Sequence, residues 1–167
     1  MRNLPLPRTK KVNARYPLIL TTGRILSQYN VGAQTRRTEN VTWHKEDRLE
    51  IHPHDAEERG IKEDDWVGVT SRAGETVLRA TVTTRVQPGV VYTTFHFPEL
   101  GVNVITTENS DWATNCPEYK VTAVQVTKVN QPSAWQQRYQ QFDRRQQAFL
   151  AHATHPDESA EAEAPVK

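Results

Sequence analysis

The stretch LILTTGRILSQYNVGAQTRRT, residues 18–38, joins a short apolar strand to a loop rich in glycine, threonine and arginine. The loop opens with TTGR at 21–24 and closes with TRRT at 35–38. Glycine lets the backbone approach a ligand closely, threonine hydroxyls donate hydrogen bonds, and the planar guanidinium group of arginine matches a phosphate. The loop therefore predicts a phosphate or pyrophosphate site. The alternative is a hairpin whose arginines are simply solvated.

Two standard phosphate-binding motifs are missing from the sequence. It contains neither G-x-x-x-x-G-K-[ST] nor G-x-G-x-x-G. The first would indicate a P-loop and the second a Rossmann-type dinucleotide site. The loop at 18–38 therefore needs another explanation.

Composition limits the class of protein. A chain of 167 residues has room for one domain with tails. Its 21 Lys and Arg against 20 Asp and Glu give a net charge of +1, so the overall charge favours neither nucleic acid nor an anionic membrane as a partner. The single cysteine, Cys116, excludes an internal disulfide and fits a reducing compartment. Without an apolar membrane span or signal peptide in the sequence, we expect a cytoplasmic, soluble protein.

Patterning divides the chain into four parts. Residues 1–16 are basic and contain proline, and we interpret them as an arm or linker. Residues 17–130 carry the predicted strands, residues 131–152 a helix, and residues 153–167 a disordered acidic tail. We therefore expect one folded domain with extensions at both ends.

The pattern of residues 17–130 indicates many short strands separated by glycine and proline turns. A short helix is predicted over Asp55–Arg59, with Gly60 as its stop. The loop at 96–119 is long for a compact domain, which is typical of functional segments. This pattern indicates a mainly β fold, either a barrel or a sandwich, and we favour the barrel because closure protects strand edges. Strands are predicted at 17–22, 48–52, 66–72, 76–84, 90–95 and 121–127, with a weaker extended run at 41–44.

The only long helix is predicted at about 134–151. Its aromatic residues are spaced by four, three and seven positions and form a narrow apolar stripe: Trp135, Tyr139, Phe142 and Phe149. We favour packing of this stripe on its own domain. The alternative is a docking surface for another chain.

Several motifs in a fixed order resemble one family. About residues 16–128 resemble the C-terminal molybdopterin dinucleotide-binding domain of the large (alpha) subunit of molybdenum- or tungsten-dependent formate dehydrogenases, in the dimethyl sulfoxide reductase superfamily. No single motif would suffice, and the specificity lies in their order. The motifs are TTGR (21–24), QTRRT (34–38), GIKEDDWVGVTSRAG (60–74), FHF (95–97), NVITT (103–107) and PEYK (117–120).

The resemblance implies a double-psi β-barrel, with short helices and the long C-terminal helix, that binds bis(molybdopterin guanine dinucleotide), an anionic cofactor carrying molybdenum or tungsten. It implies two contact regions in this chain. The first is the opening loop, where the residues implied are Thr22, Gly23, Arg24, Gly32, Thr35 and Arg37. The second is the long loop and its flanks, where they are His96, Phe97, Asn103, Thr106, Tyr119 and Lys120.

For two of these residues the residue types alone leave an alternative. His96 can be a buried histidine at a strand end whose hydrogen bonds are made within the protein, and Lys120 can be an ordinary surface lysine. Cys116 is interpreted as a structural thiol. The remaining histidines show no metal-site spacing, so we predict neither catalytic residues nor a metal ligand in this sequence.

In the family, the metal's protein ligand, the catalytic side chains and the iron–sulfur cysteines belong to an earlier domain. The resemblance therefore implies a partner, the catalytic iron–sulfur subunit or domain of a formate dehydrogenase, which oxidises formate to carbon dioxide and passes electrons to an acceptor such as NAD. Met1 stands just before the domain, which suggests a small subunit, the product of a split gene, or a fragment.

Two other functions compete with this hypothesis. One is a non-catalytic carrier or maturation factor that holds the same cofactor. The other is a barrel for a different phosphate-containing ligand or RNA, which the near-neutral charge makes the weakest of the three.

Overall fold

The computed structural model describes residues 12–106, 113–114, 119–134, 136–138, 141 and 144. The chain divides into two units, residues 1–133 and 134–167. Several sequence predictions lie wholly or partly outside the described residues: residues 1–11 of the arm predicted at 1–16, Cys116, the aromatic stripe of Trp135, Tyr139, Phe142 and Phe149, and the tail at 153–167.

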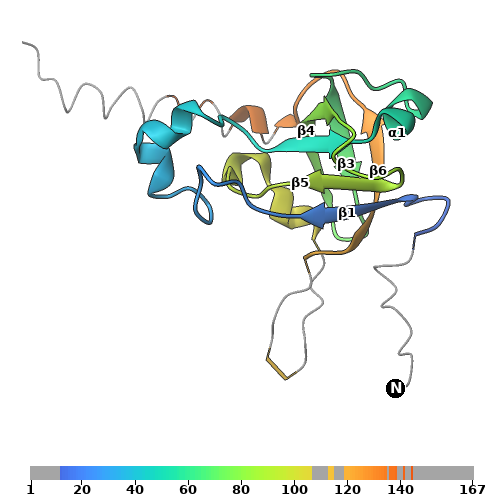
Figure 1. The fold of residues 1–167 in the computed structure, drawn as a ribbon, viewed down its shortest axis with the longest axis horizontal. Coiled ribbons are helices and arrows are strands. Elements are labelled where there is room, and N and C mark those ends of the chain that lie inside the picture. The colour runs from blue at the N-terminus through green and yellow to red at the C-terminus, as the bar shows by residue number, and fades with distance from the viewer. Residues whose placement is uncertain are drawn as a thin grey trace, which may run out of the picture. The chain divides into compact units, whose positions relative to one another are not determined.

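The first unit is a closed barrel of six strands in the order β1-β5-β2-β4-β3-β6 (Figure 1). Strand β1 runs parallel to β5 and strand β2 parallel to β4, whereas the other neighbours are antiparallel. The prediction of a mainly β barrel is thus confirmed. The strands are β1 (Leu18–Thr22), β2 (Arg48–Ile51), β3 (Trp66–Thr70), β4 (Glu75–Val82), β5 (Val90–Thr93) and β6 (Thr122–Lys128).

Alternation along each strand fills the barrel. Side chains with a period of two point alternately inward and outward, so one set is buried. Leu49 and Ile51 of β2, like Val124 and Val126 of β6, belong to the core, as the sequence predicts. The intervening residues, such as Glu50 of β2, face outward, where they remain available for polar contacts.

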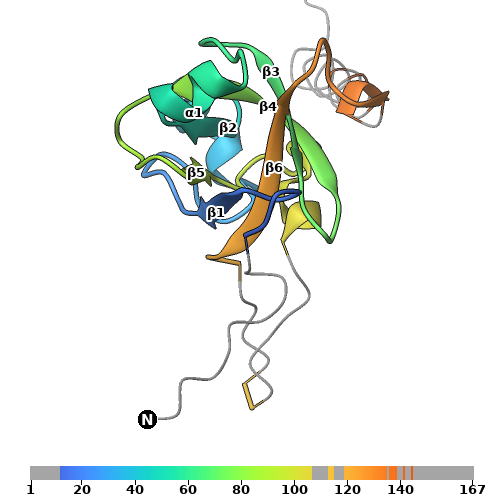
Figure 2. The same ribbon diagram turned by 90° about the vertical axis from the view of Figure 1, so that its right-hand side faces the viewer.

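Helix α1 (Pro53–Glu58) follows β2, and Figure 2 shows it beside that strand. It ends in a Schellman motif, because the Gly60 N–H donates to the Glu57 carbonyl at 3.1 Å and the Ile61 N–H to the Ala56 carbonyl at 2.9 Å. Ala56 and Ile61 both join the core. Gly60 has a φ of +62°, which confirms its predicted role as the helix stop.

Replacing Gly60 with alanine is expected to lower the free energy of unfolding by about 1 kcal/mol, since an L-residue is strained at positive φ. Nothing lies within 4 Å of a Cβ added there, so the cost is conformational and not steric. Urea denaturation measures it. Gly60→Asn is the control, because asparagine tolerates this conformation and should recover part of the loss. A Gly60→Ala protein as stable as the wild type would contradict the helix-end geometry.

The extended run predicted at 41–44 is wrong. A 3₁₀ helix occupies Glu39–Thr42, and the Thr38 hydroxyl caps it by accepting the Asn40 N–H at 3.4 Å. The Thr42 hydroxyl donates to the Glu39 carbonyl at 2.7 Å. Local side-chain bonds of this kind compete with strand formation and override the β preference of the valine and tryptophan nearby.

The second unit is described only in part. Ala134, residues 136–138, Gln141 and Arg144 are helical, and the long helix predicted around them otherwise falls on residues outside the described ranges. Within the described part of the chain, no helix is long and apolar enough to cross a membrane.

Candidate functional site

The parallel pair β1 and β5 brings two loops to one end of the barrel. Parallel neighbours end at the same edge of a sheet, so the segments after Thr22 and Thr93 leave side by side (Figure 1). The Gly23 N–H donates to the Thr93 carbonyl at 3.0 Å and extends the pairing by one residue. The glycine- and arginine-rich loop therefore lies next to the FHF segment, although more than 70 residues separate them in sequence.

A pocket of about 400 Å³ opens at this end. Phe95 is its aromatic centre: the Arg24 guanidinium carbon lies 5.2 Å from the ring centroid, and the Tyr119 ring packs edge-on at 6.3 Å. A cation, amides and a hydroxyl thus surround aromatic rings, which suits an anionic ligand with a flat heterocycle. The pocket is lined by Arg24, Asn30, Val31, Phe95, Asn103, Thr106 and Tyr119.

Gly23 makes room for Tyr92 of the adjacent strand. A Cβ at Gly23 would lie 2.3 Å from the Tyr92 hydroxyl oxygen. That hydroxyl donates to the Arg24 carbonyl at 3.4 Å, so it holds the backbone that carries the guanidinium group. Burial raises the pKa of the Tyr92 hydroxyl, and the nearby Glu50 carboxylate raises it further, so both favour the protonated form that donates this bond.

Two bonds join the end of β1 to the start of β6. The Thr22 hydroxyl donates to the Tyr119 carbonyl at 2.8 Å, and the Lys120 ammonium donates to the Thr22 carbonyl at 2.6 Å. The Lys120 nitrogen also lies 5.5 Å from the centroid of the Tyr119 ring. An ammonium group has three donors, so Lys120 keeps two that are not used by Thr22.

A buried amide lies within the opening loop. The Thr35 hydroxyl accepts the Tyr29 N–H at 3.2 Å and donates to Gln28 Oε1 at 2.6 Å. Gln28 is itself buried, and its Nε2 has no hydrogen-bond partner among the described residues. A buried donor without a partner costs about 1–3 kcal/mol, so this group fits a ligand that supplies an acceptor.

Arg36 fixes the second half of the loop. It forms a bidentate pair with Glu99, at 3.0 and 2.6 Å, and lies 5.0 Å from the Phe97 ring centroid. Gly32, at φ +70°, lies close to the Arg36 side chain: a Cβ added to Gly32 would be 2.5 Å from Arg36 Cδ. Arg37 is exposed. The first of the two arginines therefore anchors the loop, and the second faces solvent.

His96 and Phe97 are buried beneath the pocket. The Asp47 carboxylate accepts their backbone N–H groups, at 3.1 Å from His96 and 2.9 Å from Phe97, and a third hydrogen bond from the Thr94 hydroxyl. Burial raises the pKa of the Asp47 carboxyl, against the opposing effect of these hydrogen bonds. Asp47 therefore fixes the strand end from which Phe95 projects.

The structure brings four of the twelve residues implied by the resemblance into the pocket. They are Arg24, Asn103, Thr106 and Tyr119. The others support the pocket or lie in the loop beside it. Sequence reasoning missed residues that line the pocket or brace it, namely Gln28, Asn30, Val31, Asp47 and Phe95. Two of them gave a signal: Phe95 opens the FHF motif, and asparagine at position 30 tolerates the left-handed conformation that it adopts, with φ +47°.

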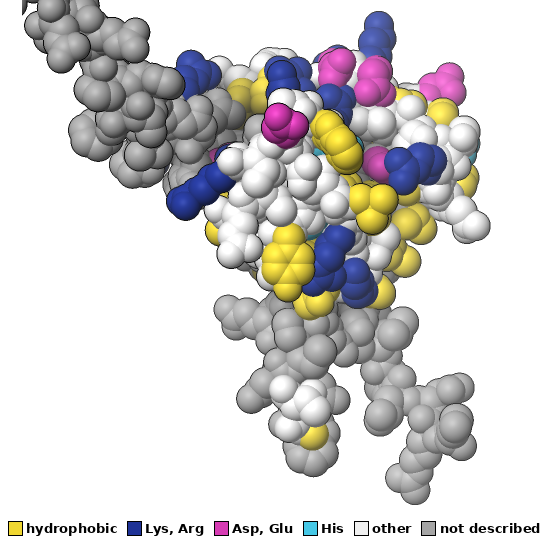
Figure 3. Space-filling model, turned by 60° about the vertical axis from the view of Figure 1, so that its left-hand side comes forward, with side chains coloured by type: hydrophobic (Ala, Val, Ile, Leu, Met, Phe, Trp, Pro, Cys, Tyr) yellow, Lys and Arg dark blue, Asp and Glu magenta, His cyan; other side chains and the backbone are white. Residues whose placement is uncertain are grey.

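Large apolar side chains are exposed on the same loop. Leu26 is 105% exposed and Trp43 is 71% exposed, with Tyr29 between them in the chain. Figure 3 shows hydrophobic side chains in yellow interleaved with dark-blue Lys and Arg on one face of the molecule. Tyr, Trp and Arg are enriched where proteins bind one another.

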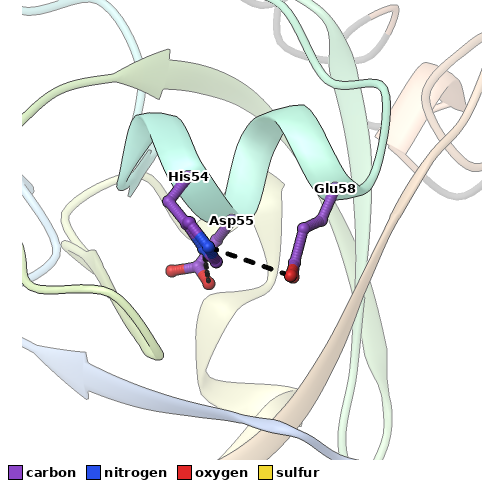
Figure 4. Close-up of side chains that lie close together, drawn as sticks. All are labelled: His54, Asp55 and Glu58. Carbon is purple, nitrogen blue, oxygen red and sulfur yellow. Dashed lines mark ion pairs between the residues drawn. The ribbon is translucent and has the colours of Figure 1, made fainter.

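A separate group of polar side chains lies on α1 (Figure 4). His54 lies 3.8 Å from Asp55 and 4.0 Å from Glu58. Asp55 also accepts the Gly89 N–H at 2.7 Å, and the Arg59 guanidinium lies 3.3 Å from Glu58. These carboxylates thus already have partners within the protein, which explains their arrangement without a metal ion.

Comparison with known proteins identifies the family of the chain. The family model described as "Molydopterin dinucleotide binding domain" matches residues 18–123. The chain is 42% identical over 118 residues to F420-dependent formate dehydrogenase 1 subunit alpha of Methanococcus maripaludis, a match that covers 70% of this chain and 18% of that protein. It is 33% identical to the assimilatory nitrate reductase catalytic subunit of Bacillus subtilis, over 75% of this chain and 18% of that protein.

Among solved structures, acetylene hydratase from Pelobacter acetylenicus has a similar fold, with a TM-score of 0.59 at 17% identity, over 68% of this chain and 18% of that one. The chain thus spans about a fifth of the length of the relatives that it matches. The family match covers most of the barrel and includes the opening loop. The chain belongs to the molybdopterin dinucleotide-binding domain family.

Proposed function

We propose that this domain binds bis(molybdopterin guanine dinucleotide) at the pocket around Arg24, as part of a formate dehydrogenase-type oxidoreductase. The observation that carries the proposal is the convergence of a guanidinium, an amide and a hydroxyl on two aromatic rings at the end of β1 and β5. We further propose that the barrel has double-psi topology, which its two parallel strand pairs support.

The residues at the pocket fit such a group. Arg24 is exposed and presents a planar fork to a pyrophosphate, in a charge-assisted bond about twice as strong as a neutral one. Asn103 can donate and accept at a heterocycle edge, while Phe95 and Tyr119 offer flat apolar faces. Gln28, in the opening loop beside the pocket, has a buried donor with no partner among the described residues. When bound, the cofactor supplies metal-centred redox chemistry, and this chain's residues bind and orient it.

Formate is proposed as the substrate of the whole enzyme. Identity is higher to formate dehydrogenase alpha subunits, at 42–44%, than to nitrate reductases, at 33–38%. The metal's protein ligand and the iron–sulfur clusters would come from a catalytic partner subunit or domain, in a cytoplasmic assembly. The apolar side chains exposed around Leu26 and Trp43 support a protein partner on that face.

A carrier or maturation factor is the second candidate. The loop favours it in one respect: its internal bonds, such as Arg36 to Glu99, hold it in place without any partner chain. A carrier would bind the cofactor stably on its own, whereas a module of a larger enzyme would retain it only within the assembly.

One purification separates these functions. The tagged chain is isolated from its native cells, and the eluate is assayed for molybdenum, tungsten and acid-released GMP, with identification of co-eluting chains. Metal and GMP together with an iron–sulfur chain support the formate dehydrogenase module. Cofactor without a second chain supports the carrier. An eluate that contains an iron–sulfur chain but neither metal nor GMP would contradict both.

Replacing Gln28 with leucine is expected to separate cofactor binding from stability. The free energy of unfolding of the cofactor-free chain should change by about 1 kcal/mol at most, because removal of the unpartnered Nε2 donor offsets the loss of the hydrogen bond that Gln28 Oε1 accepts from the Thr35 hydroxyl. GMP content of the purified assembly should fall several-fold. Urea denaturation and acid-released GMP measure the two effects. Normal GMP content in this variant would show that Gln28 makes no contact with the cofactor.

A further inference from the structure

We propose that His96 is a positioning residue whose neutral Nδ1–H tautomer ties the opening loop to the FHF segment and so shapes the pocket. The inference rests on the proposed function only in assigning that pocket to the cofactor. Its structural content, a tautomer and two hydrogen bonds, can be tested in the chain without any ligand. The role differs from a direct cofactor contact, which the resemblance implies for this residue.

The two ring partners fix the tautomer. The Ile25 N–H lies 3.1 Å from His96 Nε2, and a backbone N–H can only donate, so Nε2 must accept. His96 Nδ1 contacts the Asn30 carbonyl oxygen, which can only accept, so Nδ1 must carry the proton. Among the three protonation states of imidazole, only the neutral Nδ1–H form satisfies both partners.

The His96 ring is fixed by its two hydrogen bonds and by stacking on Phe95, so its position determines that of the opening loop. His96 is fully buried, at 0% exposed, and stacks on Phe95 with 5.4 Å between ring centroids. Its backbone N–H is bound by the Asp47 carboxylate at 3.1 Å. Ile25 follows Arg24 in the chain and Asn30 lines the pocket itself. The His96 imidazole thus binds both ends of the 25–30 segment and holds them next to the end of β5.

Protonation would break this arrangement. In imidazolium both nitrogens are donors, so Nε2–H would face the Ile25 N–H, and the bond would be lost. The charged groups around the ring are the Asp47 carboxylate, the Arg24 guanidinium, which lies over the Phe95 ring, and the Arg36 guanidinium, which lies over the Phe97 ring and pairs with Glu99. We therefore infer that the loop loosens when His96 is protonated.

Nitrogen-15 NMR of histidine-labelled full chain without cofactor tests the tautomer directly. At pH 7.5, the His96 signals should show a protonated Nδ1 and an unprotonated Nε2, which differ by tens of ppm. The His96→Gln spectrum assigns them by their disappearance. A protonated Nε2 at this pH would overturn the proposal, and this measurement does not depend on the stability of any variant.

Hydrogen exchange of the Ile25 amide tests the consequence. Once exchange is corrected for its intrinsic pH dependence, the protection of this amide should be about tenfold lower when His96 is protonated than when it is neutral, the effect of losing one hydrogen bond. In His96→Gln the glutamine side chain does not bind a proton at the pH values used, so the protection of the Ile25 amide should not vary with pH. His52→Gln is the matched control, because His52 Nδ1 also accepts a backbone N–H, from His54 at 3.1 Å, but at the N-cap of α1.

The outcomes separate this inference from the proposed function. Equal protection of the Ile25 amide in the protonated and the neutral state of His96, as NMR reports them, overturns the positioning role, whatever the chain binds. The chain could give the predicted NMR and exchange results and yet hold no guanine dinucleotide in its native assembly. This outcome would support the positioning role of His96 and overturn the cofactor assignment.

Discussion

Replacing Asp47 with alanine is expected to lower the free energy of unfolding by about 3–5 kcal/mol, a large effect for a single residue. The carboxylate is buried and accepts hydrogen bonds from the His96 and Phe97 backbone and from the Thr94 hydroxyl. Alanine leaves these three donors without their acceptor and adds a cavity. Burial raises the pKa of Asp47, so the ionised carboxyl is itself costly to bury, and the lost stability comes from the hydrogen bonds that the carboxyl accepts.

Urea denaturation of the full chain measures the change. Asp47→Asn should be less damaging, because its amide oxygen can still accept two of the three bonds while its NH₂ faces one donor. Glu57→Ala, on the exposed face of α1, is the control and should stay within about 0.5 kcal/mol of the wild type. A loss below about 1 kcal/mol in Asp47→Ala would show that the carboxylate does not hold the strand end.

Replacing Arg24 with alanine is expected to reduce cofactor retention about tenfold or more, since a hydrogen bond to a charged group contributes about 1.5–3 kcal/mol. The side chain is exposed, so the free energy of unfolding of the cofactor-free chain should change little. Acid-released GMP per mole of purified assembly measures retention. Arg24→Lys should recover only part of the loss, because lysine keeps the charge but not the planar fork.

The matched control is Arg85→Ala. Its guanidinium is also exposed and pairs with Glu50 at 3.2 Å, away from the pocket residues. This variant should keep its full complement of GMP. Equal losses in the two variants would indicate a general electrostatic effect, and full retention in Arg24→Ala would remove Arg24 from the site.

The barrel was predictable because its signals are local. Alternation in Arg48–Ile51 and Thr122–Lys128 reports which side chains face inward, and glycine at positions 60 and 89 marks turns with positive φ. Barrel closure follows from the need to protect strand edges. The pairing of β1 with β5 joins segments some 70 residues apart, and no local pattern in the sequence encodes that pairing.

The phosphate-type loop was predictable by composition, but the division of labour within it was not. Arg36 and Arg37 are adjacent and chemically identical, and the fold alone decides that the first pairs with Glu99 while the second is exposed. His96 was equally ambiguous. In the structure both ring nitrogens of His96 have backbone partners. Its contacts within the chain are therefore those of a buried histidine whose hydrogen bonds are made by the protein itself.

Asp47 shows the limit of sequence reasoning most clearly. It stands among charged residues at the start of a half-buried strand, where a solvated side chain would be the ordinary expectation. It is instead buried, because the Thr94, His96 and Phe97 donors converge on it from a segment nearly 50 residues away. Such a role depends on tertiary pairing alone, and only the structure reveals it.

The most direct measurement is the structure of the chain in its native assembly with the cofactor bound, determined by electron cryo-microscopy. A pyrophosphate oxygen should lie about 3 Å from the Arg24 guanidinium. A heterocycle should pack against Phe95 and Tyr119, and an acceptor should lie opposite Gln28 Nε2. A cofactor bound on the outer face near Glu50 and Arg85, with Arg24 in solvent, would contradict this arrangement.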